Sequence, residues 1–310
     1  MTAPAREMSE EELDALFERV KNWGRWGPDD QRGALNYITE KKVAEATALV
    51  TLGRTVSGAL DLATTPAPHN PVPVAHYMIR AGDIQEGTGS ADYFAVASHG
   101  VSITHLDALC HIFHRGLMYN GRPKSLVTST GALANSIESG RDGIVSRGVL
   151  LDIPRVSGRQ WLEPGDAIYV EDLEAAEAAQ GVKVEEGDIL LIYTGRHQRR
   201  QHHEQHEGFP DGKLAGLHAS TLDWIYERRV AVLGCDGVSD VRPSGTGGIY
   251  GIPIHTIAIP AMGLHLLDNA DFGEIAATCA ELGRYAFLLT LAPLRLPKGT
   301  ASPVNPIAMF

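Results

Sequence analysis

Residues 98–114 read Ser98-His99-Gly100-Val101-Ser102-Ile103-Thr104-His105-Leu106-Asp107-Ala108-Leu109-Cys110-His111-Ile112-Phe113-His114. This mostly apolar run holds five histidine and aspartate side chains: His99, His105, Asp107, His111 and His114. Buried ionisable groups are costly unless they are paired or coordinated. A fold that keeps this many in one stretch is therefore expected to use some of them chemically.

Alternation along the stretch predicts that His105 and Asp107 share a face. If residues 101–109 form a strand, side chains two apart point the same way, ~6.6 Å apart along the chain. An imidazole and a carboxylate on one face are the beginning of a site for zinc or manganese. His111, four residues beyond the carboxylate, can reach back as a general acid or base.

The competing interpretation of this stretch is structural. A single histidine in an apolar strand is more often a buried, hydrogen-bonded side chain, and a His-x-Asp pair alone is a weak pattern. The crowding of histidines favours the functional interpretation. For His99, a straight strand would place the side chain ~20 Å from His105. Only a turn at Gly100 brings His99 close enough to take part, either in acid–base catalysis or as a ligand.

A second group of candidate ligands lies far along the chain. His255 and Asp268 fall in the apolar stretch 255–269. We expect both to complete the metal set formed by His105 and Asp107, from a distant part of the sequence.

Three further residues are candidates for substrate binding. Asp236 follows the apolar run 230–235, and ligands often bind at the end of a buried strand in α/β proteins. A turn residue is the alternative at that position. His114 closes the histidine-rich stretch. Trp26, with Trp23, either walls a pocket or holds an N-terminal arm against another subunit. The polar tract 196–206 predicts a solvated loop.

Composition excludes several classes of protein. Lys and Arg number 27 against 38 Asp and Glu, a net charge of −11 over 310 residues, which argues against a nucleic-acid partner. No apolar run reaches the ~18 residues of a membrane span, and the first residues do not resemble a signal peptide. Three cysteines form a sparse, odd set that fits a reducing compartment. We therefore expect a cytoplasmic protein that acts on a small molecule.

Short strands interspersed with helices predict an α/β fold. The expected helices cover residues 10–22, 39–50, 171–180, 219–228 and 270–283. The expected strands cover residues 56–62, 76–80, 92–98, 101–109, 148–153, 189–194, 230–235, 254–259 and 285–291. No shift in composition marks a second domain, so residues 1–53 are predicted to form an N-terminal helical arm and residues 54–310 a single catalytic domain.

The motifs of this chain resemble those of the cyclase/kynurenine-formamidase-like family of metal-dependent hydrolases. The run Thr104-His105-Leu106-Asp107-Ala108-x-x-His111 is similar to the family signature H-x-G-T-H-x-D-x-P-x-H. Further similar blocks occur in the same order along the chain: Trp26-Gly27-Pro28-Asp29-Asp30, Gly148-Val149-Leu150-Leu151-Asp152, Gly187-Asp188-Ile189, His255 with Asp268-Asn269, and Ser302-Pro303-Val304-Asn305-Pro306. The Trp-Gly-Pro-Asp-Asp block is typical of the longer members.

The resemblance implies a swivelling β/β/α domain with a β-barrel-like core, assembled as a homodimer or homotetramer. It implies hydrolysis of an amide, imide or lactone bond in a small molecule, as with formylkynurenine or isatin. By position, His105 and Asp107 match metal ligands and His111 matches the catalytic histidine. His255 and Asp268 match the later His and Glu that hold a second metal in dinuclear members.

The chain departs from the signature at its first histidine, which falls on Val101, a residue that cannot ligate a metal. The zinc or manganese site is then either mononuclear or lost. Three functions stay open on the sequence alone. The first is a metal-dependent hydrolase with His111 as general acid and base. The second is a metal-independent acid–base enzyme, such as a cyclase, dehydratase or lactone hydrolase, and the third is a non-catalytic small-molecule binding protein.

Overall fold

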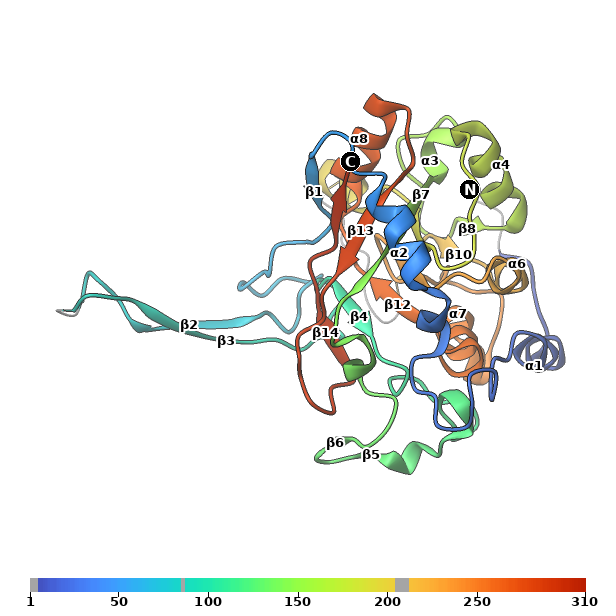
Figure 1. The fold of residues 1–310 in the computed structure, drawn as a ribbon, viewed down its shortest axis with the longest axis horizontal. Helices are drawn as coiled ribbons and strands as arrows, with labels where there is room; N and C mark the ends of the chain where they lie inside the picture. The colour runs from blue at the N-terminus through green and yellow to red at the C-terminus, as the bar shows by residue number, and fades with distance from the viewer. Residues whose placement is uncertain (1–4, 85–86, 204–211) are drawn as a thin grey trace.

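A mixed nine-stranded sheet, curled into a half-barrel, forms the centre of the molecule (Figure 1). The computed structural model describes residues 5–84, 87–203 and 212–310. The order across the sheet is β1 (Thr55–Ser57), β15 (Ile307–Met309), β13 (Ala286–Leu291), β7 (Ile144–Asp152), β9 (Ile189–Tyr193), β11 (Val232–Cys235), β12 (His265–Asp268), β4 (His105–Asp107) and β14 (Ala301–Pro303). β7, β9, β11 and β12 run parallel to one another, and the flanking pairs are antiparallel.

Both faces of the sheet are covered. Along β7, Val149 and Leu151 belong to one buried cluster, whereas Leu150 belongs to another. Because successive side chains of a strand point to opposite faces, a continuous apolar strand of this kind needs cover on both sides. The α-helices of the described residues are α1 (Glu10–Arg19), α2 (Glu40–Thr47), α3 (Ile153–Val156), α4 (Val170–Gln180), α5 (Arg196–His203), α6 (Thr221–Glu227), α7 (Pro253–Ile257) and α8 (Gly273–Leu282). Among them, α2, α3, α4 and α8 contact strands of the main sheet.

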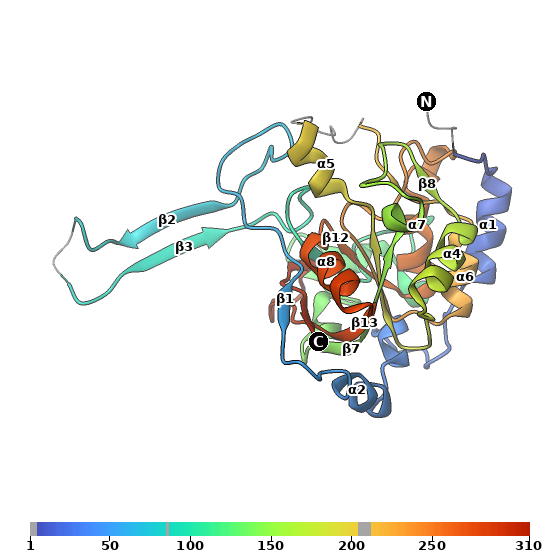
Figure 2. The same cartoon turned by 90° about the horizontal axis from the view of Figure 1, so that it is seen from above.

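Three small strand pairs lie outside the main sheet. They join β2 (Ala75–Arg80) to β3 (Ala91–Ala95), β5 (Val127–Thr128) to β6 (Gly131–Ala132), and β8 (Ala167–Ile168) to β10 (Gly216–Leu217). The β2–β3 pair projects far from the body of the molecule (Figures 1 and 2).

The two N-terminal helices begin where their capping residues predict. Ser9 and Glu12 form a reciprocal capping box at the start of α1, and the Thr39 hydroxyl accepts a hydrogen bond from Lys42 N at the start of α2. The α1 side chains Leu13 and Leu16 are buried among residues of the main core of this same chain. The sequence predicts an arm that needs another surface, but the body of its own chain already covers this apolar face. The boundary at residue 53 and the swivelling-domain class stay predictions.

Four expected elements differ most from the structure. The stretch 56–62 is extended as a strand only over β1. The apolar run 254–259 is helical rather than extended, because Pro253 occupies the first turn of α7 and the Asp240 carboxylate accepts a hydrogen bond from Ile254 N at 2.7 Å. The stretch 101–109 is extended only over β4. The tract 196–206 is not a solvated loop where it is described, since α5 occupies its first part and buries Arg196 and His197. Residues 204–206 lie outside the described residues.

The three cysteines are free and buried. Among the residues that the structure describes, no helix combines the length and apolar character needed to cross a bilayer.

Candidate active site

The pairing of β4 with β12 brings the two candidate ligand groups together. In the antiparallel register, His105 lies opposite Asp268. His105 and Asp107 share a face, as expected from their spacing, and both are buried, at 5 % and 1 % exposed. The intervening Leu106 is buried in the core on the other side of the sheet.

A tight turn brings His99 into the same site. Gly100 N donates to Ala97 O at 3.2 Å, and Ile103 N donates to Gly100 O at 3.4 Å. The chain therefore reverses direction, and His99 Nδ1 lies 3.0 Å from Asp107 Oδ1. Of the two geometries considered above for this histidine, the structure has the turned one.

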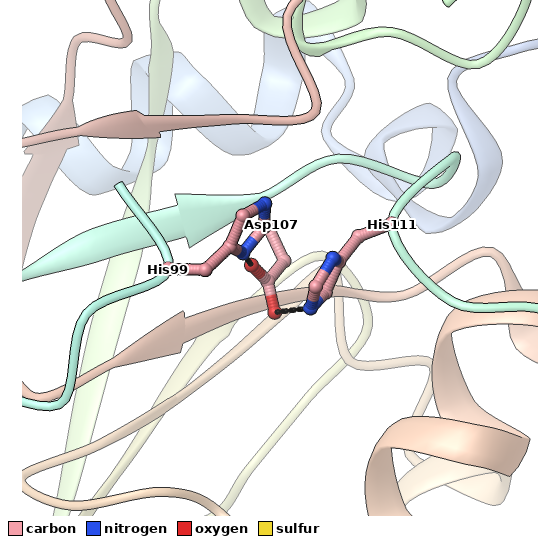
Figure 3. A group of neighbouring side chains, drawn as sticks. All are labelled: His99, Asp107 and His111. Atoms are coloured by element: carbon pink, nitrogen blue, oxygen red, sulfur yellow. Dashed lines mark ion pairs between the residues drawn. The ribbon is translucent and has the colours of Figure 1, made fainter. Parts of the chain in front are cut away.

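His111 follows β4 in the next loop and points its imidazole at the Asp107 carboxylate (Figure 3). Its Nε2 lies 3.9 Å from Asp107 Oδ2. The ring stacks on His99, with 3.7 Å between ring centroids and 14° between planes. The side chain of His111 keeps 27 % of its surface exposed, so its imidazole can exchange protons with a molecule in the cavity.

His255 reaches the site from α7. Its Nε2 lies 3.0 Å from Asp268 Oδ2 and 3.7 Å from Asp107 Oδ2. Its Nδ1 donates to Asp240 Oδ2 at 2.5 Å. Asp268 is itself held by Ser239, whose hydroxyl donates to Asp268 Oδ1 at 2.9 Å.

In three of the four imidazoles, the ring nitrogen that points away from Asp107 has a hydrogen-bond partner. His105 Nδ1 donates to Ile103 O at 2.7 Å, His99 Nε2 lies 3.0 Å from the Thr300 hydroxyl, and His255 Nδ1 bonds Asp240. The Ile103 carbonyl and the Asp240 carboxylate can only accept hydrogen bonds, so they hold His105 and His255 with Nδ1–H outward and Nε2 toward the carboxylates of the site. Both Asp107 carboxylate oxygens are buried and have no hydrogen-bond partner among the described residues.

This donor set fits a divalent metal ion. A buried carboxylate without a hydrogen-bond donor, surrounded by imidazole nitrogens, is satisfied by a cation. Two overlapping triplets have ligand atoms within 4.8 Å of one another, namely His99–Asp107–His111 and Asp107–His255–Asp268. Mixed imidazole and carboxylate ligands suit zinc and several other first-row metals.

The pKa values of Asp107 and His111 are shifted in the directions that such a site needs. Burial opposes ionisation of Asp107, but the nearby imidazoles of His111, His105 and His99 outweigh it and hold the pKa of Asp107 well below its usual range. Burial lowers the pKa of His111 to about 4. At neutral pH the site therefore holds an ionised carboxylate beside an uncharged imidazole.

The pKa values of His255 and His105 are raised, in contrast to that of His111. Burial disfavours protonation of His255, yet the Asp268 and Asp240 carboxylates raise its pKa well above the ordinary value. The pKa of His105 is also raised, because the nearby Asp107 and Asp268 carboxylates outweigh burial. Since protons and metal ions compete for the same imidazole nitrogen, metal binding here is expected to release protons.

These groups line one cavity of about 590 Å³. All six residues that the sequence proposed as catalytic or metal-binding contribute to its wall, from His99 to Asp268. Val101, at the position of the missing motif histidine, lines it without offering a ligand. The rest of the wall is largely apolar and includes Ile112, Phe113 and Ile249.

The three residues expected to bind substrate are not among the described lining residues of this cavity. Asp236 is buried behind it and accepts hydrogen bonds from Thr194 N, the Thr194 hydroxyl and Arg196 N. His114 stacks on Phe17 of α1. Its Nε2 lies 2.7 Å from the Tyr250 hydroxyl.

Trp26 packs edge-on against Tyr37, with 5.0 Å between ring centroids. Neither ring is among the residues that line the cavity.

Sequence reasoning missed Asp240, Ser239 and Thr300. Asp240 lies in the loop that follows β11, four residues beyond the candidate Asp236, so the right loop was identified but the wrong carboxylate was chosen. A turn-forming acidic residue before a Pro-initiated helix is a capping signal. The separation of Asp240 and Pro253 by twelve residues hid that signal.

Known proteins share this fold. Residues 32–240 match a family model described as "Putative cyclase". The crystal structure of a novel cyclase superposes with a TM-score of 0.85 at 31 % identity, over 95 % of this chain and 99 % of that one. A search of the curated proteins found no match.

Two more distant structures share the fold. Isatin hydrolase A from Labrenzia aggregata has a TM-score of 0.61 at 19 % identity, covering 85 % of this chain and 94 % of that one. A "predicted metal-dependent hydrolase" from Bacillus stearothermophilus has a TM-score of 0.51 at 14 % identity, covering 82 % and 97 %. The family match and the 31 % identical structure decide the assignment: this chain belongs to the cyclase family.

Proposed function

We propose that this protein is a metal-dependent hydrolase that opens an amide, imide or lactone bond of a small molecule. The observation that carries the proposal is the buried Asp107 carboxylate, which has no hydrogen-bond donor and is faced by imidazoles whose other ring nitrogen is hydrogen-bonded. The isatin hydrolase and the metal-dependent hydrolase among the structural relatives support the same reaction class.

The proposed ligands are Asp107, His105, His255 and Asp268, with His99 in place of the histidine that the motif lacks at Val101. A zinc or manganese ion held there supplies Lewis acidity, which makes a water more acidic and a carbonyl more electrophilic. Asp107 and Asp268 provide the negative charge that such an ion requires, and Asp240 holds His255 in the tautomer that presents its Nε2.

His111 moves the protons. Its imidazole is uncharged at neutral pH, because burial lowers its pKa to about 4. It accepts a proton from the attacking water as the new C–O bond forms. It then donates that proton to the leaving nitrogen or oxygen as the C–N or C–O bond of the substrate breaks. The products are a carboxylic acid, which ionises by releasing the second proton of the water to solvent, and an amine, amide or alcohol.

The cavity supports a substrate with an apolar body. Its polar end carries the histidines and carboxylates, whereas Ile112, Phe113 and Ile249 form an apolar wall. Burial of apolar surface on that wall would stabilise the complex by roughly 25 cal/mol per Å². A small aryl amide, cyclic imide or lactone meets both requirements.

Metal analysis and a chelation experiment test this proposal. The purified protein is expected to contain zinc or manganese and to hydrolyse at least one member of an aryl formamide, cyclic imide and lactone panel. Removal of the metal should abolish turnover, and adding it back should restore the rate. His99→Ala should lower the metal content, whereas His202→Ala, a change of the same type on α5, should not. Full turnover by metal-free protein would instead identify a metal-independent acid–base enzyme.

A further inference from the structure

One buried side chain beside the metal site links segments that are far apart in the sequence. Asn269 follows Asp268, lines the active-site cavity and is 1 % exposed. Its φ is +53°, in the left-handed region that asparagine enters more readily than most residues. Its backbone N donates to Gly237 O at 2.8 Å, and its other three polar groups also have partners. A buried polar group that is bonded in this way holds its neighbours in one arrangement.

Two of these bonds reach the segment that carries His99 and His105. The Asn269 side chain donates from Nδ2 to Gly100 O at 3.3 Å, and its backbone oxygen accepts from the Thr104 hydroxyl at 2.7 Å. Gly100 belongs to the turn that brings His99 into the site, and Thr104 directly precedes His105. The position of Asn269 therefore sets where this turn lies relative to β4.

The orientation of the Asn269 amide is fixed from α5. Arg196 Nη1 donates to Asn269 Oδ1 at 2.9 Å. A guanidinium can only donate, so it bonds the amide oxygen and leaves the NH₂ group for Gly100 O. Arg196 is 8 % exposed, and a hydrogen bond from a charged donor is stronger than one between neutral groups.

Arg196 is in turn held at its backbone by Asp236. The buried Asp236 carboxylate accepts from Arg196 N at 3.0 Å and, on its other oxygen, from Thr194 N at 2.9 Å. The carboxylate that the sequence offered as a substrate contact thus anchors the start of α5. A continuous series of contacts runs from this carboxylate through Arg196 and Asn269 to the turn at Gly100.

His99 needs such support more than the other proposed ligands do. His105 and Asp268 are held by the ladder between β4 and β12, whereas His99 lies in a turn outside any strand. The Thr300 hydroxyl and the His111 ring contact the His99 side chain, but not the backbone of its turn.

We propose that Arg196 and Asn269 are positioning residues that keep His99 where it completes the metal site (Figure 3). This inference rests on the proposed function, in which His99 is a metal ligand. Val101 offers no ligand atom, so the site depends on a histidine that a turn has to place. The polar tract that begins at Arg196 thereby contributes to the site without touching the substrate.

Zinc affinity in a double-mutant cycle tests this role. Arg196→Met keeps much of the side-chain length but removes the donor to Asn269 Oδ1. In competition with a chromophoric chelator, this variant should bind zinc roughly 10–100-fold more weakly than the parent, the cost of losing an outer partner of a metal site. In a His99→Ala background the same change should cost less than about twofold, because the ligand that Arg196 positions is already absent.

Arg199→Met is the matched control. Arg199 is a second buried arginine of α5, and its Nε donates to Glu163 Oε2 at 2.8 Å, away from the cavity wall. This variant should bind zinc as the parent does. Arg196→Lys keeps the buried charge without the planar guanidinium and serves if Arg196→Met does not fold. It should weaken zinc binding by roughly threefold or more, again only when His99 is present.

The possible outcomes separate this inference from the proposed function. Equal losses of zinc affinity with and without His99 would show that Arg196 acts on the whole site, and they would overturn the inference. Parent and Arg196 variants with the same zinc affinity would also overturn it, while leaving the metal site itself intact. A parent protein that binds neither zinc nor manganese would overturn the proposed function together with this inference.

Discussion

Asp240 Oδ2 accepts a hydrogen bond from His255 Nδ1 at 2.5 Å, and the other oxygen of the same carboxylate accepts one from Ile254 N at 2.7 Å. One side chain thus caps the start of α7 and sets the tautomer of the histidine that α7 carries into the cavity. The local structure and the chemistry of the site depend on the same carboxylate.

Replacement of Asp240 by Asn should weaken metal binding without unfolding the protein. The amide keeps an oxygen for the helix cap but removes the charge that orients His255, a change that typically costs 10–100-fold in metal affinity. Competition with a chromophoric chelator measures the affinity. The exposed Asp223, which pairs with Arg19 on the surface, supplies the control Asp223→Asn. Equal affinities for both variants would show that Asp240 only caps the helix.

Replacement of His111 by Asn should separate catalysis from metal binding. The side chain keeps a similar shape but cannot take up a proton, so kcat should fall by roughly 10²–10⁴-fold while bound metal stays at the parent's level. Steady-state rates on any amide, imide or lactone that the parent hydrolyses, together with elemental analysis, check this. The control is His202→Asn, outside the cavity. If the His111 variant lost its metal along with its activity, this imidazole would be a ligand instead.

Stability should fall in mild acid because of His197. This imidazole is buried and lies 3.1 Å from Ala270 O, and burial, with Arg196 and Arg200 nearby, lowers its pKa to about 3. In the unfolded chain the group binds a proton near pH 6.5, so acid favours the unfolded state between those values. The contribution of the uncharged His197 to the free energy of unfolding is complete above pH ~6.5 and is lost as the pH falls. Between pH 7 and pH 5 the loss is about 2 kcal/mol.

Urea unfolding at both pH values measures this dependence. A His197→Gln variant has no titrating group at that position, so the change in its unfolding free energy from pH 7 to pH 5 should be smaller than the parent's by about the same 2 kcal/mol. Identical pH dependence in the two proteins would rule out His197 as the source.

Replacement of two glycines with positive φ by alanine should lower the free energy of unfolding by unequal amounts. Gly33 has φ +56°, and a Cβ there would lie 2.2 Å from Gly263 O, whereas Gly24 has φ +75° and open space around it. Gly24→Ala should destabilise by roughly 1–2 kcal/mol from the backbone conformation alone. Gly33→Ala adds a clash with backbone and should cost roughly 2–4 kcal/mol in total. Chemical denaturation of the two variants checks the order, and equal costs would contradict the close approach.

The amino-acid sequence determined the features that depend on neighbours along the chain. The capping residues Ser9 and Thr39 predicted where α1 and α2 begin, because a cap bonds backbone two or three residues away. The spacing of two between His105 and Asp107 predicted a shared face, because the strand repeat is local. The order of the motifs also identified the family, and with it the pairing of these residues with His255 and Asp268.

Other features were decided only by contacts between distant segments. The run 254–259 is short and mostly apolar, so its pattern could not distinguish a strand from a helix, and Asp240 resolved the choice from another loop. The approach of His99 to Asp107 depends on a turn that no periodicity encodes. Hydrophobic alternation reports which side of an element is covered, but it does not report what covers it. For that reason, packing of α1 on its own chain and exposure of Tyr77 and Tyr93 on the β2–β3 pair became visible only in three dimensions.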